Sequence, residues 1–343
     1  MILLTLIPLM VALQTERPSS CESLASELGR ANQALNDGKS EDAEAILSSL
    51  QAGTGECPKT LLLLGRAKAA GGMPTAARNL LTEYTQSVPN DSVGHLALGQ
   101  LLWEQRDYGA ADASVDAALR LNPREAKTVL LKAEIQDGEG QQDEARRLFE
   151  QASQLAPHDV EVQLAAGKFF DRHQESSRAI AVFRQVLKLD SANPFAWDYL
   201  GLGYEREGDA LEAEKAYQRG LAVNQPPHFD PFLPYNLGRI LAKRGRLSES
   251  EQYLNDAVRL SPKTRAVYYE RARLYLLLNN FAGAQADAER ALQLPDPGQY
   301  IQDPQVYSLL AIVYERLSQK DLARQYAALA RETKLLGSSK GRQ

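Results

Sequence analysis

The stretch from Pro194 to Tyr217, PFAWDYLGLGYEREGDALEAEKAY, contains the spacing that decides the fold. Two small residues, Gly201 and Ala213, stand twelve positions apart in it, and the same pair recurs along the chain. The first small residue recurs, with successive gaps of 34, 34, 34, 34, 34, 37, 34 and 39, at Ala31, Gly65, Gly99, Ala133, Gly167, Gly201, Gly238, Ala272 and Ala311. The second recurs twelve residues later each time, at Ala43, Ala77, Ala111, Ala145, Ala179, Ala213, Ser250, Ala284 and Ala323.

A small residue on each of two helices lets their backbones approach closely, so this pattern predicts an antiparallel helical hairpin that repeats. Apolar residues at positions i, i+3 and i+4, as at Phe183, Val186 and Leu187, indicate helices with one buried face. Alternation with a period of two, which is typical of strands, does not run over any useful length. We therefore predict an all-α solenoid.

The same stretch resembles a known repeat. The W-x2-L-G-x2-Y and A-x3-F/Y signature of the tetratricopeptide repeat is matched by Trp197, Leu200, Gly201, Tyr204, Ala213 and Tyr217. The resemblance implies a right-handed superhelical solenoid of antiparallel helix pairs, with eighteen helices in nine repeats over residues 21–337. These units begin near Leu24, Pro58, Ser92, Ala126, Val160, Pro194, Pro231, Arg265 and Pro304. Repeat 7 departs from the pattern, because Pro234 stands where the tryptophan-like residue belongs.

Glycines and prolines mark the ends of the expected helices. Glycine is expected at the turn inside a unit, at Gly38, Gly72, Gly140, Gly208 and Gly245. Proline stops the second helix, because it lacks an N–H group and has a fixed φ, at Pro89, Pro123, Pro157 and Pro262.

The composition is that of an ordinary globular protein, with 24% charged residues and a formal net charge of −5 over 343 residues. A nucleic-acid-binding protein usually carries a basic stripe, so we expect no nucleic-acid partner. Length alone favours about two domains, but a solenoid grows by one neighbour contact at a time. The unbroken period therefore predicts one continuous array.

Residues 1–20 differ from the repeats. The run from Ile2 to Leu13 is apolar except for Thr5 and Pro8, and its roughly twelve residues are too few to span a bilayer. This length is typical of a secretory signal peptide, although no Lys or Arg precedes the run. We expect export, to a periplasm or to the exterior. The alternatives are an uncleaved anchor, a misassigned start, or a helix packed on repeat 1 in a cytoplasmic protein. Residues 338–343 are expected to form a disordered tail.

The two cysteines bear on the compartment. Cys21 precedes the first helix of repeat 1, and Cys57 is expected at the end of its second helix. Those two ends lie side by side in an antiparallel hairpin, so a Cys21–Cys57 disulfide would close the terminal repeat, as exported proteins permit. The alternative is two buried free thiols.

Motifs for chemistry are lacking. The four histidines lie in different repeats without a second ligand nearby, so we expect no metal site and no cofactor. Gly201-Leu202-Gly203 lies inside a predicted helix rather than between a strand and a helix, so it is not a dinucleotide fingerprint. No nucleophile motif is present, and we expect no enzyme activity.

The remaining candidate is the concave groove, which the first helix of each repeat lines in this family. Repeats 6 to 8 are richest there in the aromatic and arginine side chains that anchor interfaces. We predict partner binding by Tyr235, Arg239, Tyr269 and Arg273, with Asn236, Tyr199 and Phe232 beside them. The alternative is that these residues satisfy one another, with Arg239 paired to Glu270 or Asp198.

Two functional classes follow. The first is a non-catalytic scaffold or adaptor that holds a peptide or a segment of another protein in its groove. The second is a structural subunit that packs through its convex face. The Lys, Asn and Arg clamp with which some family members grip chaperone tails is disfavoured, because only Asn236 matches it and Glu270 would repel a carboxylate. The sequence leaves the oligomeric state open.

Overall fold

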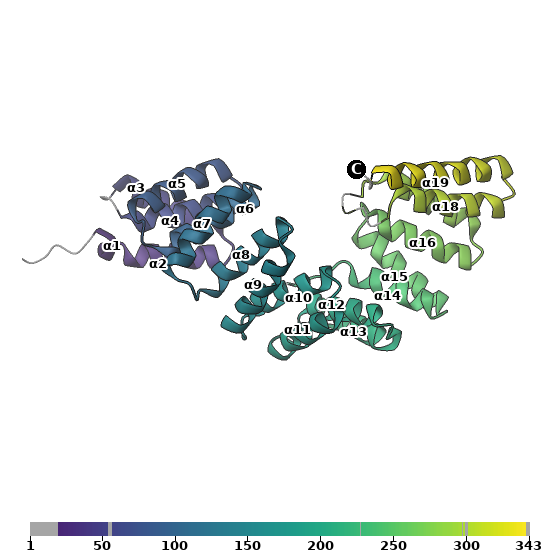
Figure 1. The fold of residues 1–343 in the computed structure, drawn as a ribbon, viewed down its shortest axis with the longest axis horizontal. Helices are drawn as coiled ribbons and strands as arrows, with labels where there is room; N and C mark the ends of the chain where they lie inside the picture. The colour runs from purple at the N-terminus through teal and green to yellow at the C-terminus, as the bar shows by residue number, and fades with distance from the viewer. Residues whose placement is uncertain (1–19, 54–56, 227, 297, 299–300, 341–343) are drawn as a thin grey trace, which may run out of the picture. The chain divides into compact units, whose positions relative to one another are not determined.

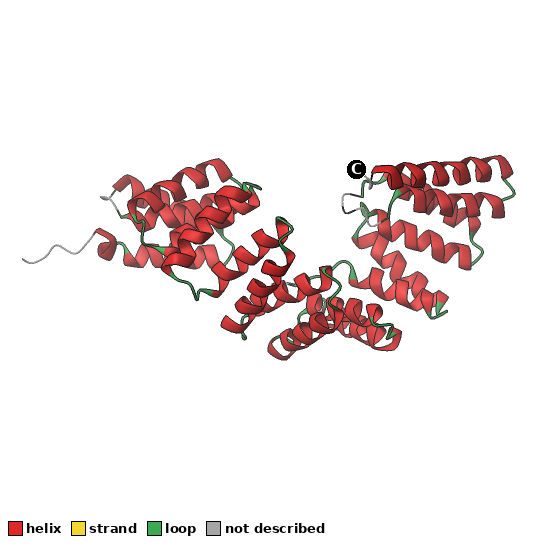
Figure 2. Cartoon of the chain, in the orientation of Figure 1, coloured by secondary structure: helices red, strands yellow, loops and turns green. Residues whose placement is uncertain are grey.

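The computed structural model describes residues 20–53, 57–226, 228–296, 298 and 301–340, and helices dominate these ranges (Figures 1 and 2). No strand occurs in them beyond an isolated bridge between Gln225 and His228. The predicted all-α fold class is therefore confirmed. The segment 1–19 and the end of the predicted tail, 341–343, lie outside the described residues.

By compactness the chain divides into two units, Met1–Leu155 and Ala156–Gln343. The division is physically reasonable, because each repeat of a solenoid contacts only its neighbours, so compactness is local. The first unit contains α1 (Ser20–Ser23), α2 (Ala25–Asn36), α3 (Ser40–Gly53), α4 (Pro58–Ala70), α5 (Pro74–Ser87), α6 (Ser92–Glu104), α7 (Tyr108–Leu121), α8 (Ala126–Gly138) and α9 (Gln142–Leu155).

The second unit contains five further helix pairs. They are α10 (Val160–Arg172), α11 (Ser176–Leu189), α12 (Pro194–Arg206), α13 (Ala210–Val223), α14 (Leu233–Lys243), α15 (Leu247–Leu260), α16 (Arg265–Leu277), α17 (Phe281–Gln293), α18 (Asp303–Arg316) and α19 (Lys320–Lys340). The nine predicted pairs are thus present from α2/α3 to α18/α19, preceded by the short α1. Helix α19 extends three residues into the segment expected to be a tail.

The small residues lie where the helices of a pair approach most closely. A Cβ atom on Gly201 would stand 2.3 Å from the Tyr217 ring, and one on Gly99 would stand 2.9 Å from a Val115 methyl group. In both cases the large residue comes sixteen positions later, on the second helix of the same pair. Each hairpin therefore fits a large side chain of its second helix against a small residue of its first.

Every hairpin turn contains one residue in the left-handed region, at the same place in the repeat. Five are the predicted glycines, with φ between 73° and 83°. In the other four hairpins this conformation is adopted, with φ between 58° and 61°, by Arg106, Gln174, Asn279 and Ser318. The packing of the repeat therefore fixes the turn geometry, even where the turn residue is not glycine and the left-handed conformation is unfavourable for it.

Cys21 and Cys57 form a disulfide, with their Cα atoms 5.0 Å apart. Cys21 lies in α1, while Cys57 directly precedes α4, because α3 ends earlier than expected, at Gly53. Cys57 is buried in an apolar cluster with Leu24 and Leu28. The bond thus ties the start of repeat 1 to the start of repeat 2.

Candidate functional site

The predicted binding residues lie on the first helices of adjacent pairs in the second unit. Tyr199 is half-buried on α12 and stacks on Phe183, with ring centroids 5.1 Å apart. Phe232 precedes α14 and is 44% exposed. The remaining residues lie on α14, namely Tyr235, Asn236 and Arg239, and on α16, namely Tyr269 and Arg273. We call these residues together the α12–α16 face.

Arg239 is paired within the protein. Its Nη1 donates to Glu205 Oε2 on α12 at 2.9 Å, and the two side chains are only 18% and 9% exposed. Glu205 also accepts from the Tyr217 hydroxyl at 2.7 Å and from Lys243 Nζ at 3.0 Å. Burial alone would raise the pKa of Glu205, but the Arg239 charge and these hydrogen bonds outweigh it and hold the pKa below its usual range.

Arg273 is paired more loosely. Its Nη1 donates to Glu270 Oε1, one turn away on the same helix, at 2.8 Å, and 52% of the Arg273 side chain is exposed. Its guanidinium lies over the Tyr269 ring, 5.9 Å from the centroid, as that of Arg239 lies over Tyr235. Each tyrosine thus contacts the arginine of its own helix. Arg273 remains the more accessible of the two cations.

Asn236 is buried and donates from Nδ2 to Asp198 Oδ1 at 2.8 Å. Burial, reinforced by the nearby charge of Asp230, raises the pKa of Asp198 to about 8. Burial also raises the pKa of Asp230, whose backbone is held by two hydrogen bonds with the Asn224 side chain. Asn236 is therefore a buried structural residue, and its side chain is not accessible to a partner.

The sequence predictions missed the acidic residues that complete this face. Glu205 stands 34 residues before Arg239, and Asp171 on α10 stands 35 residues before Arg206, which forms a two-pronged pair with it. A separation of one repeat places two side chains next to each other on neighbouring first helices. A search for opposite charges one period apart would have found both pairs. Arg239 therefore does form an ion pair within the protein, as the alternative interpretation held. Its partner is Glu205, and not Glu270 or Asp198.

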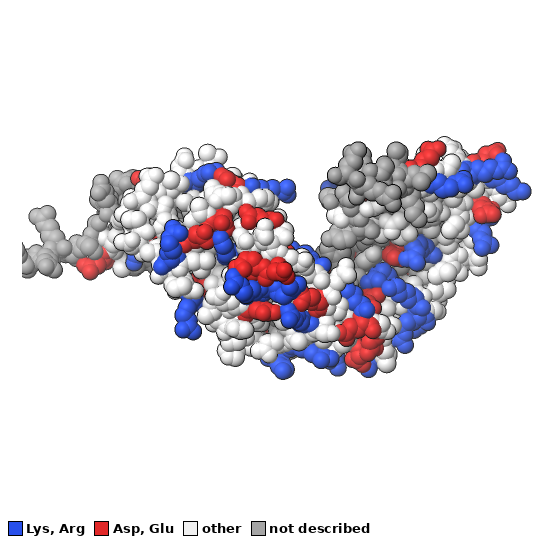
Figure 3. All heavy atoms as spheres, viewed as in Figure 1, with Lys and Arg blue, Asp and Glu red and all other residues white. Residues whose placement is uncertain are grey.

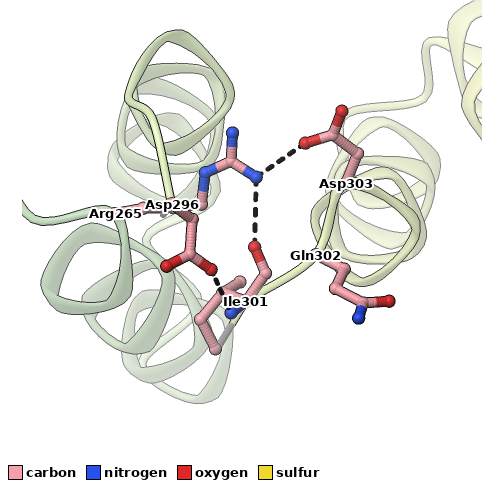
Figure 4. A pocket seen from close by; sticks show the side chains of 5 residues that line it. All are labelled: Arg265, Asp296, Ile301, Gln302 and Asp303. Atoms are coloured by element: carbon pink, nitrogen blue, oxygen red, sulfur yellow. Dashed lines mark hydrogen bonds and ion pairs between the residues drawn. The ribbon is translucent and has the colours of Figure 1, made fainter. Parts of the chain in front are cut away.

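A second polar feature surrounds a cavity of about 270 Å³ that is lined by Arg265, Asp296, Ile301, Gln302 and Asp303 (Figure 4). Arg265 points into it and donates from Nη1 to the carbonyl oxygen of Ile301 at 3.0 Å and to Asp303 Oδ1 at 2.6 Å. Asp296 accepts from the backbone N–H of Ile301 at 2.6 Å. These polar groups bind one another, so we assign the cavity a structural role.

A profile of the tetratricopeptide repeat matches the chain five times, at residues 96–160, 130–194, 164–234, 200–265 and 235–304. The chain belongs to the tetratricopeptide repeat family. The recognised repeats therefore extend from the third pair of helices, α6/α7, to the start of α18.

Known proteins share this repeat at low identity. Protein bimA of Emericella nidulans is 26% identical over 222 residues, which are 61% of this chain and 27% of bimA. A crystal structure of the APC/C hetero-tetramer Cut9–Hcn1 is similar in fold, with a TM-score of 0.61, 16% identity, and coverage of 90% of this chain and 57% of the other. A tetratricopeptide repeat protein from Parabacteroides merdae has a TM-score of 0.56 and 15% identity, with coverage of 79% and 100%. The chain thus spans about a quarter of the length of bimA.

Basic and acidic side chains are interspersed on the side shown in Figure 3. In the described ranges, no cluster of three or more His, Cys, Asp or Glu side chains could hold a metal ion. No helix there is both long and apolar enough to cross a bilayer.

Proposed function

We propose that this tetratricopeptide repeat protein is a non-catalytic scaffold that binds a segment of a partner protein on the α12–α16 face. The observation that carries the proposal is that two anchor-type side chains of this face are about half exposed: Phe232, directly before α14, and Arg273, on α16. Aromatic rings and guanidinium groups are the side chains that most often anchor protein interfaces. Asn236, which is buried, and Arg239, whose side chain is 18% exposed and paired with Glu205, hold the shape of this face.

Quantitative affinity capture from extracts of the source organism, followed by mass spectrometry, tests this proposal. A specific partner is expected to be retained by the wild-type protein and lost, by about tenfold or more, with the double variant Phe232→Ala and Arg273→Ala. The matched control is Arg259→Ala on α15, which also removes an exposed arginine paired one turn away, with Asp256. Equal retention by the double variant and by wild type would reject the α12–α16 face. Cross-links from the partner to the second helices would then favour the structural-subunit alternative, in which the convex face binds.

We also propose that the protein is exported. The apolar run at the amino terminus and the Cys21–Cys57 disulfide support this, because disulfides persist in oxidising compartments. Protein purified from its source should have lost a dozen or more residues from its amino terminus, and its mass should be two hydrogens below that of the dithiol form. A full-length chain with two thiols that react with iodoacetamide would contradict export.

A further inference from the structure

Two acidic side chains of the second unit are buried close to each other. Asp198, on α12, is 6% exposed, and Asp230, in the non-helical segment between α13 and α14, is 4% exposed. Among the charges of the protein, that of Asp230 acts most strongly on the carboxyl group of Asp198. Within the described part of the chain, neither carboxyl group forms an ion pair.

The surrounding groups supply this pair with no bonded cation. The titratable and charged groups that face it come from four helices: Lys168 and Asp171 on α10, Tyr199 on α12, Tyr217 on α13 and Arg239 on α14. Arg239 is already paired with Glu205. The charge of Lys168 acts on Asp230, but its ammonium group lies over the Tyr199 ring, 5.6 Å from the centroid. Two negative charges in one desolvated site are strongly unfavourable, so one carboxyl group of the pair holds a proton.

Asp230 also fixes the short segment that carries Phe232. Its backbone carbonyl oxygen accepts from Asn224 Nδ2 at 2.8 Å, and its N–H donates to Asn224 Oδ1 at 2.7 Å. Its Oδ1 accepts from the N–H of Phe232 at 2.9 Å. The segment 228–232 is thus anchored inside the protein at Asp230, while Phe229 before the anchor and Phe232 after it are 42% and 44% exposed.

We infer that the Asp198–Asp230 pair controls, through its bound proton, whether the segment 228–232 holds Phe232 in position for a partner. The inference rests on the scaffold function proposed above and adds a form of regulation to it. Loss of the proton places two carboxylates in one site, and Asp230 is the one that can leave it, because Asp198 is held in a helix. Movement of Asp230 toward solvent breaks its bond with the Phe232 N–H, so partner binding should weaken as the pH rises.

Fluorine NMR of the full-length protein with 4-fluorophenylalanine at position 232 tests the inference without a partner. The resonance should shift between pH 6 and pH 9, as the ring loses its fixed position. The midpoint is expected near pH 8, because burial and the charge of Asp230 raise the pKa of Asp198 to about 8. Affinity capture, as described above, adds a measure of binding: wild type should retain about threefold less partner at pH 9 than at pH 6.

Four variants separate the pair from other titrating groups. Asp198→Asn and Asp230→Asn each remove one charge of the pair and keep an oxygen acceptor, so the resonance should stay at its pH 6 position up to pH 9. His228→Gln removes the imidazole of the same segment and should leave the shift unchanged. Asp256→Asn, which removes an exposed carboxylate on α15, should also leave it unchanged.

The inference would be overturned by a fluorine resonance that does not move in wild type, by a shift that persists in both amide variants of the pair, or by loss of the shift in His228→Gln. Equal retention of the partner by wild type at pH 6 and pH 9 would also overturn it. Failure of the scaffold proposal is a different result, namely full retention by the Phe232→Ala and Arg273→Ala double variant at a single pH.

Discussion

The first helices of the two units carry the same repeat but satisfy their charges differently. In the second unit, Arg239 and Arg206 each meet a carboxylate supplied one repeat earlier, by Glu205 and Asp171. In the first unit, Arg66 meets only an amide, since Leu35 occupies the place of Glu205. The residue at the position of Glu205 and Leu35 therefore decides whether the arginine of the next repeat forms an ion pair with the preceding helix or has only a neutral partner.

The largest expected effect tests whether the second unit depends on its paired charges. Glu205→Ala leaves the guanidinium of Arg239, which is only 18% exposed, without a counter-charge and removes the acceptor of Lys243 and Tyr217. Removing one partner of a buried ion pair costs about 3 to 5 kcal/mol. Denaturant unfolding, with hydrogen exchange to locate the change in the second unit, measures this loss.

A control for Glu205→Ala is Asp256→Ala, which breaks the exposed pair with Arg259. Its effect should stay within about 0.5 kcal/mol, because exposed ion pairs contribute little. Similar losses for the two variants would show that the second unit does not rely on buried pairing.

The next effect concerns the Cys21–Cys57 disulfide of the first unit. Cys21→Ser with Cys57→Ser removes a cross-link that closes a loop of 36 residues, and the chain-entropy estimate for such a loop is about 3 to 4 kcal/mol. Hydrogen exchange should show lost protection in α2 to α4 and unchanged protection in α12 to α16. Equal loss in both units would mean that the repeats unfold as one cooperative body.

A smaller effect compares the close helix contacts of the two units. Gly201→Ala forces a methyl group against the rigid Tyr217 ring, where only 2.3 Å is available, and should cost about 2 to 3 kcal/mol. Gly99→Ala meets the methyl group of Val115 at 2.9 Å, and we expect a cost of about 1 kcal/mol. Thermal unfolding of the two variants measures the difference. Equal melting temperatures would show that the hairpins relax alike.

The last prediction is a dependence of stability on pH that arises in the second unit. The pKa of Asp198 is raised from 3.8 to about 8, so the folded chain holds a proton that the unfolded chain releases, and stability should fall as pH rises from about 4 to 8. Asp198→Asn removes this titration and can still accept the hydrogen bond from Asn236. At pH 8 the variant should be more stable than wild type by about 1 kcal/mol or more.

Denaturant unfolding at pH 5 and pH 8 checks the Asp198→Asn prediction. Glu205 supplies an internal reference, because its lowered pKa has the opposite sign: its contribution is present above about pH 4.5 and is lost as the pH falls further. The acid-side loss should therefore persist in the variant. Identical slopes for variant and wild type between pH 5 and pH 8 would contradict a protonated Asp198.

The sequence by itself determined the repeat. The paired small residues predicted where each hairpin closes, and the observed first helices begin within two residues of the predicted starts, from Pro58 in repeat 2 to Leu233 in repeat 7. These features are local, since a helix, a turn glycine and a close contact each depend on residues within one unit. The turns formed without glycine, as at Gln174, show that the repeat prevails over local preference.

Only the tertiary structure decided which charged residues already have an oppositely charged partner within the protein. Arg239 and Arg66 occupy the same position in their repeats, and both match what an interface residue requires. Their difference depends on a residue of the preceding repeat, Glu205 in one case and Leu35 in the other, which packing brings to the neighbouring helix. Burial then sets the electrostatics, because the loss of solvent raises the pKa of Asp198 from 3.8 to about 8. Side-chain pairing across helices and the loss of solvent around a carboxyl group arise only when the repeats stack, so a pattern read within one repeat does not contain them.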